Sequence, residues 1–221
     1  MLVVALSIAA ADEAGFQYAP AESGFPEDSQ PAWRRAGPRN AAQIENDALA
    51  VTLEKNDILF WVLGLRNEQE QGDAGAWQLD ATGNATITFQ LKCSSKDPEA
   101  RAFSLAATGK QAVVWIDFYN DHIQISNFSD RPISHDCEQE DTYRLVISSG
   151  KFSLLSKRSG PLAENLAVPK GAEGQYLWFG STYPFGEHPD PARSSERHWE
   201  LRFLRWTNQT ADFNVPAEEE R

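Results

Sequence analysis

From about residue 49 onward, the chain consists of short apolar runs that alternate with polar positions and are separated by turn residues. The clearest run is Ala85–Cys93, in which every second side chain is apolar: Ile87, Phe89, Leu91 and Cys93. A period of two places these side chains on one face of a β-strand. About ten such runs, and no convincing amphipathic helix, predict an all-β fold. We therefore expect a two-sheet antiparallel β-sandwich.

Residues 113–125 predict a hairpin whose two-residue turn is Asn120-Asp121, two residue types that tolerate the positive φ that such a turn requires. One set of alternating side chains is expected to face the core: Val114, Ile116, Phe118, Ile123 and Ile125. The opposite set is expected to point away from the core: Trp115, Asp117, Tyr119, His122 and Gln124.

The chain has seven Trp and twelve Phe among its 221 residues. Large aromatic side chains fill the layer between two packed sheets, so most of them are expected in the core, among them Trp61, Trp178, Trp199 and Trp206. Ile58–Leu63 is continuously apolar and is expected to be buried on both faces. One core of this size predicts a single sandwich domain over residues 12–210.

Met1–Ala11 is a short apolar run that ends in small residues before Asp12. It resembles the hydrophobic part and cleavage site of a signal peptide, although the basic residues that usually precede them are missing. The run is shorter than the ~20 residues that a transmembrane helix needs. We expect a signal peptide over 1–11, a flexible acidic tail over 211–221, and a secreted, periplasmic or cell-surface protein. The alternative is the hydrophobic end of a cytosolic protein.

The formal net charge is -12 and the sequence pI is about 4.8. Because an acidic surface repels phosphate groups, we expect no nucleic-acid partner and no attraction to anionic membrane surfaces. No stretch of the chain has the ~20 apolar residues of a transmembrane helix, so we expect no membrane insertion.

The two cysteines, Cys93 and Cys137, lack the CxxC spacing of zinc sites and thioredoxin-like redox motifs. In an oxidising compartment one disulfide between them is one interpretation. Two buried thiols that pack as small hydrophobic side chains are the other.

The second half of the chain carries a characteristic order of strands. Asp141-Thr-Tyr-Arg-Leu leads into Gly150-Lys-Phe-Ser-Leu-Leu, followed by Tyr176-Leu-Trp-Phe-Gly180 and a last strand that ends at Trp206. This order resembles the concanavalin A-like lectin/glucanase superfamily, including laminin-G-like modules, over residues 30–207. The resemblance implies a jelly-roll sandwich that often binds glycans on its concave face, sometimes with calcium. Some members of the superfamily hydrolyse glycans, and many are non-catalytic adhesion modules.

Catalytic motifs of that superfamily are not found. Its glucanases carry Glu-x-Asp-x-x-Glu on one strand, whereas Glu45-Asn-Asp47 is followed by Ala50 at the last position. Other carboxylates are interpreted as solvated charges: Glu138, Glu140, Glu196 and Glu200. The sequence favours a non-catalytic glycan-binding or adhesion module. A glycan hydrolase or lyase with dispersed carboxylates, and a structural protein–protein module, are the alternatives.

Glycan sites combine an aromatic face with polar groups that fix the sugar's orientation. We predict that the outward set of the hairpin forms the floor of such a site: Trp115, Asp117, Tyr119, His122 and Gln124. In the competing interpretation, Trp115 lies under a covering loop and Asp117 hydrogen bonds to a neighbouring strand. A carbohydrate or cell-surface glycan is the expected partner, and a protein partner is the alternative.

The loop over 182–197 adds Tyr183 to the predicted binding residues, because long loops in compact domains are often functional. It also contains Glu187, His188 and Asp190. Calcium takes six to eight oxygen ligands, which is more than this loop supplies. No cofactor is expected, with calcium kept as the open alternative.

Overall fold

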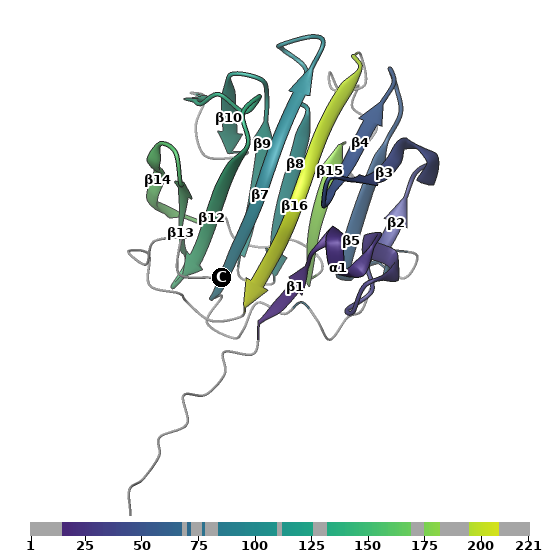
Figure 1. Ribbon diagram of the computed structural model, residues 1–221. Coiled ribbons are helices and arrows are strands. Elements are labelled where there is room, and N and C mark those ends of the chain that lie inside the picture. The colour runs from purple at the N-terminus through teal and green to yellow at the C-terminus, as the bar shows by residue number, and fades with distance from the viewer. Residues whose placement is uncertain are drawn as a thin grey trace, which may run out of the picture.

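The computed structural model describes residues 15–67, 70–71, 77, 84–109, 112–125, 132–168, 175–181 and 195–207. They form a sandwich of two antiparallel β-sheets (Figure 1), so the predicted fold class is confirmed. Helices in these ranges are limited to short turns: α1 (Pro20–Ser23), η1 (Pro26–Asp28) and η2 (Arg39–Ala41). None of them is long and apolar enough to cross a membrane. The expected signal peptide, acidic tail and Tyr183 lie outside the described residues.

The sheet nearer the viewer in Figure 1, called the front sheet, has the strand order β14-β13-β12-β7-β16-β4-β3, with β1 paired to β16. Its strands are β14 (Gly160–Ala167), β13 (Lys151–Ser156), β12 (Asp141–Ser148), β7 (Ala85–Ser95), β16 (Arg197–Thr207), β4 (Ala48–Leu53), β3 (Ala42–Glu45) and β1 (Phe16–Tyr18).

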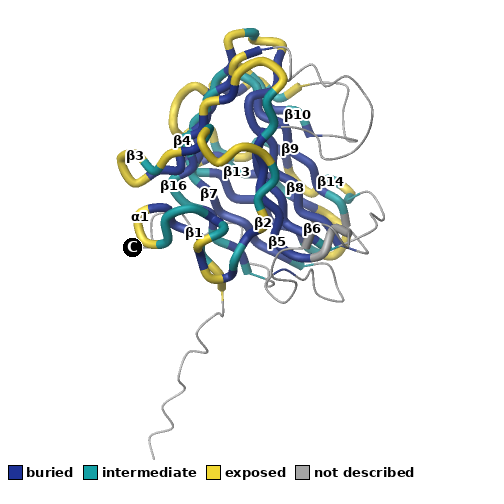
Figure 2. Tube along the Cα trace, turned by 90° about the vertical axis from the view of Figure 1, so that its right-hand side faces the viewer, coloured by how far each residue is buried: buried dark blue, intermediate teal, exposed yellow. Residues whose placement is uncertain are grey.

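The second sheet, called the back sheet, has the order β11-β10-β9-β8-β15-β5-β2, with β6 paired to β5. Its strands are β11 (Ile133–Ser134), β10 (His122–Ile125), β9 (Ala112–Phe118), β8 (Phe103–Gly109), β15 (Gln175–Ser181), β5 (Leu59–Asn67), β2 (Arg34–Ala36) and β6 (Glu70–Gln71). Figure 2 shows how much of both layers is buried.

The alternation predicted for β7 is confirmed. Ile87, Phe89 and Leu91 are buried in the core between the sheets. In the neighbouring strand β16 the register shifts between Leu201 and Phe203, which marks a β-bulge. Because a bulge inserts one residue, Leu204 returns to the core face although it lies three positions after Leu201.

The back sheet is buried on both faces. Along β5, Leu59, Trp61 and Leu63 enter the main core, while Phe60 and Val62 belong to a second buried group. This group, the outer cluster, contains Phe60, Val62, Ala106, Trp115, Tyr176 and Trp178. The two-sided burial predicted for this run is therefore confirmed. The predicted core positions of Trp61, Trp199 and Trp206 are also confirmed, whereas Trp178 is buried in the outer cluster.

Gly180, which ends the Tyr-Leu-Trp-Phe-Gly run, lies opposite Phe60 in the pairing of β15 with β5. Its φ is +144°, and a Cβ at this position would collide with the backbone of Leu59 and Phe60. Glycine is therefore required here by the close approach of two backbones.

The β9–β10 hairpin has the predicted register, with Ile123 opposite Phe118. The prediction that the turn residues adopt positive φ is wrong, because neither Asn120 nor Asp121 is among the described residues with positive φ. Asn120 instead uses its side chain: its Oδ1 accepts from the Ser95 N–H at 2.7 Å, and its Nδ2 donates to the Ser95 carbonyl at 2.9 Å. A tertiary contact thus replaces the local turn preference.

Aromatic rings form a continuous series that starts at the exposed Phe16 and continues between the sheets. Neighbouring ring centroids in it are 5.0–6.0 Å apart, a distance at which aromatic pairs attract each other. The series runs through Phe16, Trp206, Trp33, Phe179, Trp61, Trp199, Phe103, Phe118, Tyr143 and His135. It crosses repeatedly from one sheet to the other and ties them together.

Strands at the sheet borders are short or irregular. β11 has two residues and β2 three, while β3 has four. β14 is longer, but its pairing with β13 contains register shifts and includes Pro161. Proline lacks the N–H that would extend a ladder.

Replacing Trp199 by alanine should lower the free energy of unfolding by about 3–5 kcal/mol, because a fully buried indole leaves a cavity. Its ring contacts Trp61 and Phe103, and its Nε1 donates to Ser181 Oγ at 2.5 Å. Urea unfolding followed by fluorescence measures the loss. The exposed Lys151→Ala serves as control and should stay within about 0.5 kcal/mol. A loss below about 1 kcal/mol in Trp199→Ala would contradict the central role of this ring.

Candidate functional site

Trp115 and Asp117 face away from the main core, as predicted, but they are 3% and 4% exposed. The Trp115 Nε1 donates to Asp117 Oδ1 at 2.9 Å, and the same oxygen accepts from Ser104 Oγ at 2.6 Å and from Arg101 at 3.1 Å. The competing interpretation, with Trp115 covered and Asp117 bonded to a neighbouring strand, fits this geometry. The predicted floor is therefore not an exposed surface at these two residues, and their role in ligand binding stays a prediction.

Tyr119 and His122 flank the β9–β10 turn and are both half-buried. Their rings stack, with centroids 4.2 Å apart and an interplanar angle of 10°. The His122 Nδ1 lies 2.8 Å from Asp121 Oδ1. Gln124 is half-buried and lies opposite Asp117 in the hairpin register. The structure thus brings two of the predicted residues together as one partly exposed aromatic pair.

At the turn residues Asn120 and Asp121, which lie between Tyr119 and His122 in the chain, the surface is hollowed into an open cavity of about 480 Å³. Cavities of roughly 300–1,000 Å³ accommodate small ligands. The lining comes from the β9–β10 turn, from the segment 132–138, and from the loop after β7: Pro98, Asn120, Asp121, Ser134, Asp136 and Glu138. Three of these residues carry carboxylates, and two carry neutral polar groups.

The segment 132–138 forms one wall of the cavity by alternating its side chains. Ser134, Asp136 and Glu138 are exposed and line the cavity, whereas His135 and Cys137 are buried beneath it. The wall is fixed to the turn by its backbone: the His135 N–H donates to the Asp121 carbonyl and the Cys137 N–H to the Asn120 carbonyl, both at 2.9 Å.

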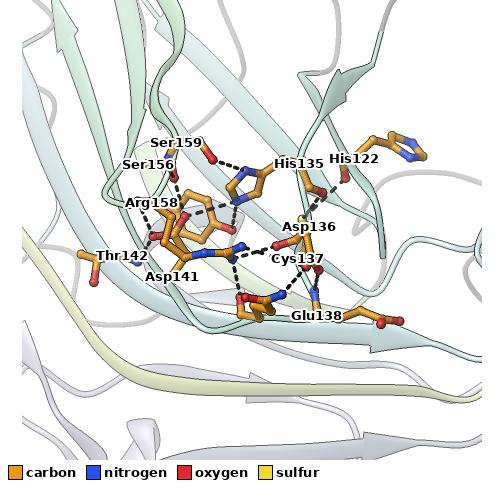
Figure 3. A network of polar contacts seen from close by, with 12 residues as sticks. His122, His135, Asp136, Cys137, Glu138, Asp141, Thr142, Ser156, Arg158 and Ser159 are labelled. Carbon is orange, nitrogen blue, oxygen red and sulfur yellow. Dashed lines mark hydrogen bonds and ion pairs between the residues drawn. The ribbon is translucent and has the colours of Figure 1, made fainter.

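A network of polar side chains supports this wall from inside (Figure 3). The His135 Nε2 lies 2.9 Å from the Tyr143 hydroxyl and 3.3 Å from Asp141 Oδ2, while its Nδ1 lies 3.2 Å from Ser159 Oγ. Asp141 also accepts from the Ser156 hydroxyl. Figure 3 shows the His122 ring pointing away from this network, although its carbonyl lies close to Cys137.

Burial pushes the pKa of Asp141 upward, but hydrogen bonds from His135, Ser156 and two backbone N–H groups outweigh it and leave the pKa below its ordinary value. Those N–H groups belong to Thr142 at 2.7 Å and Arg158 at 3.2 Å. The carboxylate therefore stays ionised at neutral pH. Its charge is held by directed hydrogen bonds, as a buried carboxylate requires.

Ser159, His135 and Asp141 have the side-chain types of a nucleophilic triad. Both ring nitrogens and both carboxylate oxygens are, however, hydrogen bonded within the network, and the His135 side chain is only 1% exposed. We therefore interpret the network as structural support for the cavity wall. Sequence reasoning missed it, because its residues come from separate segments that only the fold brings together.

The rim of the cavity is negatively charged. A hydrogen bond from His122 lowers the pKa of Asp121, which keeps this carboxylate ionised. Within the described ranges, no three His, Cys, Asp or Glu side chains are grouped so that they hold a metal ion. The expectation of no cofactor, and the calcium alternative, stay predictions.

Most carboxylates expected to be solvated charges are in surface ion pairs. Glu196 lies 2.6 Å from Lys96, and Glu140 accepts from Gln90 at 2.7 Å and from Arg202. Glu200 is 3.5 Å from Lys92. Burial raises the pKa of Glu200, but the hydrogen bond with His198 and the charge of Lys92 outweigh burial, so the pKa lies below its ordinary value. Glu138 is also exposed, and it lines the cavity.

No protein-family model matches the chain, and no curated protein sequence matches it. The fold of the chain does match those of solved structures. A sialidase is superimposable with a TM-score of 0.61 at 9% identity, over 88% of this chain and 18% of that one. A Trypanosoma rangeli sialidase in complex with 2,3-difluorosialic acid gives 0.57 at 11% identity, over 82% and 28%. Botulinum neurotoxin type C gives 0.52 at 8% identity, over 83% and 44%.

Identity this low shows the fold alone. The chain spans less than half the length of each of these structures. The similarity therefore supports a β-sandwich that also occurs as a part of larger proteins.

Asp141→Asn tests the network through the dependence of stability on pH. The folded pKa of Asp141 lies below the unfolded value of 3.8, so its stabilisation is complete above that value and is lost as the pH falls through the folded pKa. At pH 7 the variant should be less stable by about 2–3 kcal/mol, because an ionised hydrogen-bond acceptor is removed. The difference from the original protein should shrink below pH 4 in urea unfolding. A difference that stays constant down to pH 2.5 would contradict this assignment.

Proposed function

We propose that the chain is a secreted, non-catalytic glycan-binding or adhesion module of the concanavalin A-like superfamily. Its binding site is the cavity at the β9–β10 turn. The observation that carries this proposal is a cavity lined with carboxylate, amide and hydroxyl groups, at a turn whose two flanking residues, Tyr119 and His122, stack their rings. Rings that contact the C–H face of a sugar, combined with a few polar groups that fix its orientation, are the usual elements of a glycan site.

The polar lining suits sugar hydroxyls. Asp121, Asp136 and Glu138 offer carboxylate oxygens that accept hydrogen bonds, and the Ser134 hydroxyl both donates and accepts. The low pKa of Asp121 supports this role, since an ionised carboxylate is an acceptor only. Bonds from neutral hydroxyls to an ionised carboxylate are stronger than those between neutral groups.

The similar solved structures support a glycan partner. One is a sialidase bound to 2,3-difluorosialic acid, and botulinum neurotoxin type C interacts with two ganglioside molecules. Among the described residues that line the cavity of this chain, three carry carboxylates and none is basic. Because like charges repel, its ligand is a neutral or amino-bearing glycan rather than one that ends in an anionic sugar.

A glycan hydrolase needs a carboxylic acid whose pKa is raised so that it can donate a proton at neutral pH. The hydrogen bond from His122 moves the pKa of Asp121 in the opposite direction. Asp121 therefore does not suit the role of general acid in a hydrolase.

Secretion follows from the signal-peptide-like run over 1–11 and belongs to the same proposal. The domain spans residues 12–210 and ends before the acidic tail over 211–221. A module of this kind meets cell-surface or matrix glycans outside the cell.

Screening the purified chain on a glycan array, with and without calcium, tests the proposal. Saturable binding without released sugars is the expected result. Tyr119→Ala should weaken that binding about fivefold, since loss of one aromatic contact is worth about 1 kcal/mol. Lys151→Ala is the matched surface control and should bind normally. Released sugars would establish the hydrolase alternative, and no binding to any glycan would favour a protein partner.

The charge of the ligand is tested by comparing one glycan with and without a terminal sialic acid. The neutral form should bind more tightly. Glu138→Gln should narrow the difference about fivefold, because one like charge at contact distance in water is worth about 1 kcal/mol. Isothermal titration at low and high salt measures both affinities, and the gap should shrink with salt. Tighter binding of the sialylated form would show that the acidic cavity is not the site.

A further inference from the structure

Cys93 and Cys137 are far apart in the sequence but adjacent in the fold. Cys93 lies near the end of β7 in the front sheet, and Cys137 lies in the cavity wall. The Cys93 N–H donates to the Cys137 carbonyl at 2.9 Å. Each residue is 1% exposed. Both thiols are free in this structure.

The positions of the two cysteines are compatible with an S–S bond between their side chains. The hydrogen bond from the Cys93 N–H to the Cys137 carbonyl holds the two backbones side by side. Disulfides span Cα distances of about 4.4–6.8 Å. Both side chains also belong to the same buried core between the sheets.

We propose that Cys93 and Cys137 form a disulfide while the chain folds, and that this bond fastens the cavity wall to the front sheet. The oxidant is a disulfide of the glutathione or thiol–disulfide oxidoreductase class. In two exchange steps the two cysteine thiols lose two protons and two electrons to it. One S–S bond forms between Cys93 and Cys137, one S–S bond of the oxidant breaks, and two thiols of the oxidant are released.

The disulfide must form while the chain folds, because both thiols are buried in the folded protein. Thiol–disulfide exchange requires a thiolate and access to it. Burial, and then the hydrogen bond with Cys137, hold the pKa of the Cys93 thiol well above its ordinary value. The segment 132–138 covers the pair once it is seated on the β9–β10 turn. The two cysteines therefore keep the redox state, thiol or disulfide, that they have when the segment 132–138 packs onto the turn.

This inference does not depend on the ligand of the cavity. It concerns the wall that carries Ser134, Asp136 and Glu138, and it holds for a glycan or a protein partner alike. Its consequence is that a chain folded in an oxidising compartment has a covalently fixed site, whereas a chain folded under reducing conditions has a site held by hydrogen bonds alone.

The test refolds the full chain from denaturant in a mixture of reduced and oxidised glutathione, and in parallel with a phosphine reductant. Oxidative refolding should give a monomer whose mass is lower by two hydrogens and whose peptide map links Cys93 to Cys137. Its Tm should exceed that of the reduced protein by about 5–10 °C. Two free thiols after oxidative refolding, a bond between chains, or equal Tm values would overturn the proposal.

The double variant Cys93→Ala/Cys137→Ala is the control, and its Tm should be the same in both refolding mixtures. Protection by the fold is measured on the reduced, folded protein with an aromatic disulfide reagent. Its thiols should react at least a hundredfold more slowly than those of the urea-unfolded chain. Reaction at a similar rate in both states would refute formation at the folding stage, even if the bond is found.

Discussion

The aromatic series between the sheets is the contact on which the rest of this structure depends. Two face-packed sheets lie about 10 Å apart, and rings are the side chains that fill such a gap from both sides. Here the series begins at Phe16 on β1 and ends at His135. Tyr143 is the last ring in the core, and its hydroxyl lies 2.9 Å from the His135 ring. The packing of the core therefore continues directly into the polar network that holds the cavity wall.

The candidate site depends more on where the backbone places its side chains than on which residue types it contains. Asp121 reaches the cavity because the turn is two residues long, and Asp136 and Glu138 reach it because an extended segment alternates its side chains. Asn120 lines the same cavity while its amide is bound to Ser95 of another strand. A flexible loop with the same residues would not hold its carboxylates and the aromatic pair in one fixed arrangement, and fixed arrangement is what limits the entropy lost on binding.

Much of the fold could be predicted from the sequence, because strand alternation is a local property. The core faces of β7 and of the β9–β10 hairpin, and the two-sided burial of β5, follow from the order of residues alone. The environment of Trp115 could not be predicted in the same way. Alternation tells which face a side chain occupies, but it does not tell whether that face is covered.

The candidate site was predicted only in part, for a similar reason. Tyr119 and His122 flank a turn that is visible in the sequence, so their proximity could be predicted, while their role in binding stays a prediction. His135, Asp141, Ser156 and Ser159 come from three different segments, and only the fold brings them within hydrogen-bond distance. The pairing of Cys93 with Cys137 likewise depends on how the wall is seated, which no spacing in the sequence reveals.

The short and interrupted border strands affect how neighbouring molecules of this chain interact when they are close together. An exposed border with a long row of free N–H and C=O groups invites a strand from another molecule. The borders here offer two residues in β11, three in β2 and four in β3, and a proline in β14. Such borders give neighbouring molecules little backbone to pair with. Copies can therefore crowd at high local concentration, as on a densely covered surface, without fusing into larger sheets.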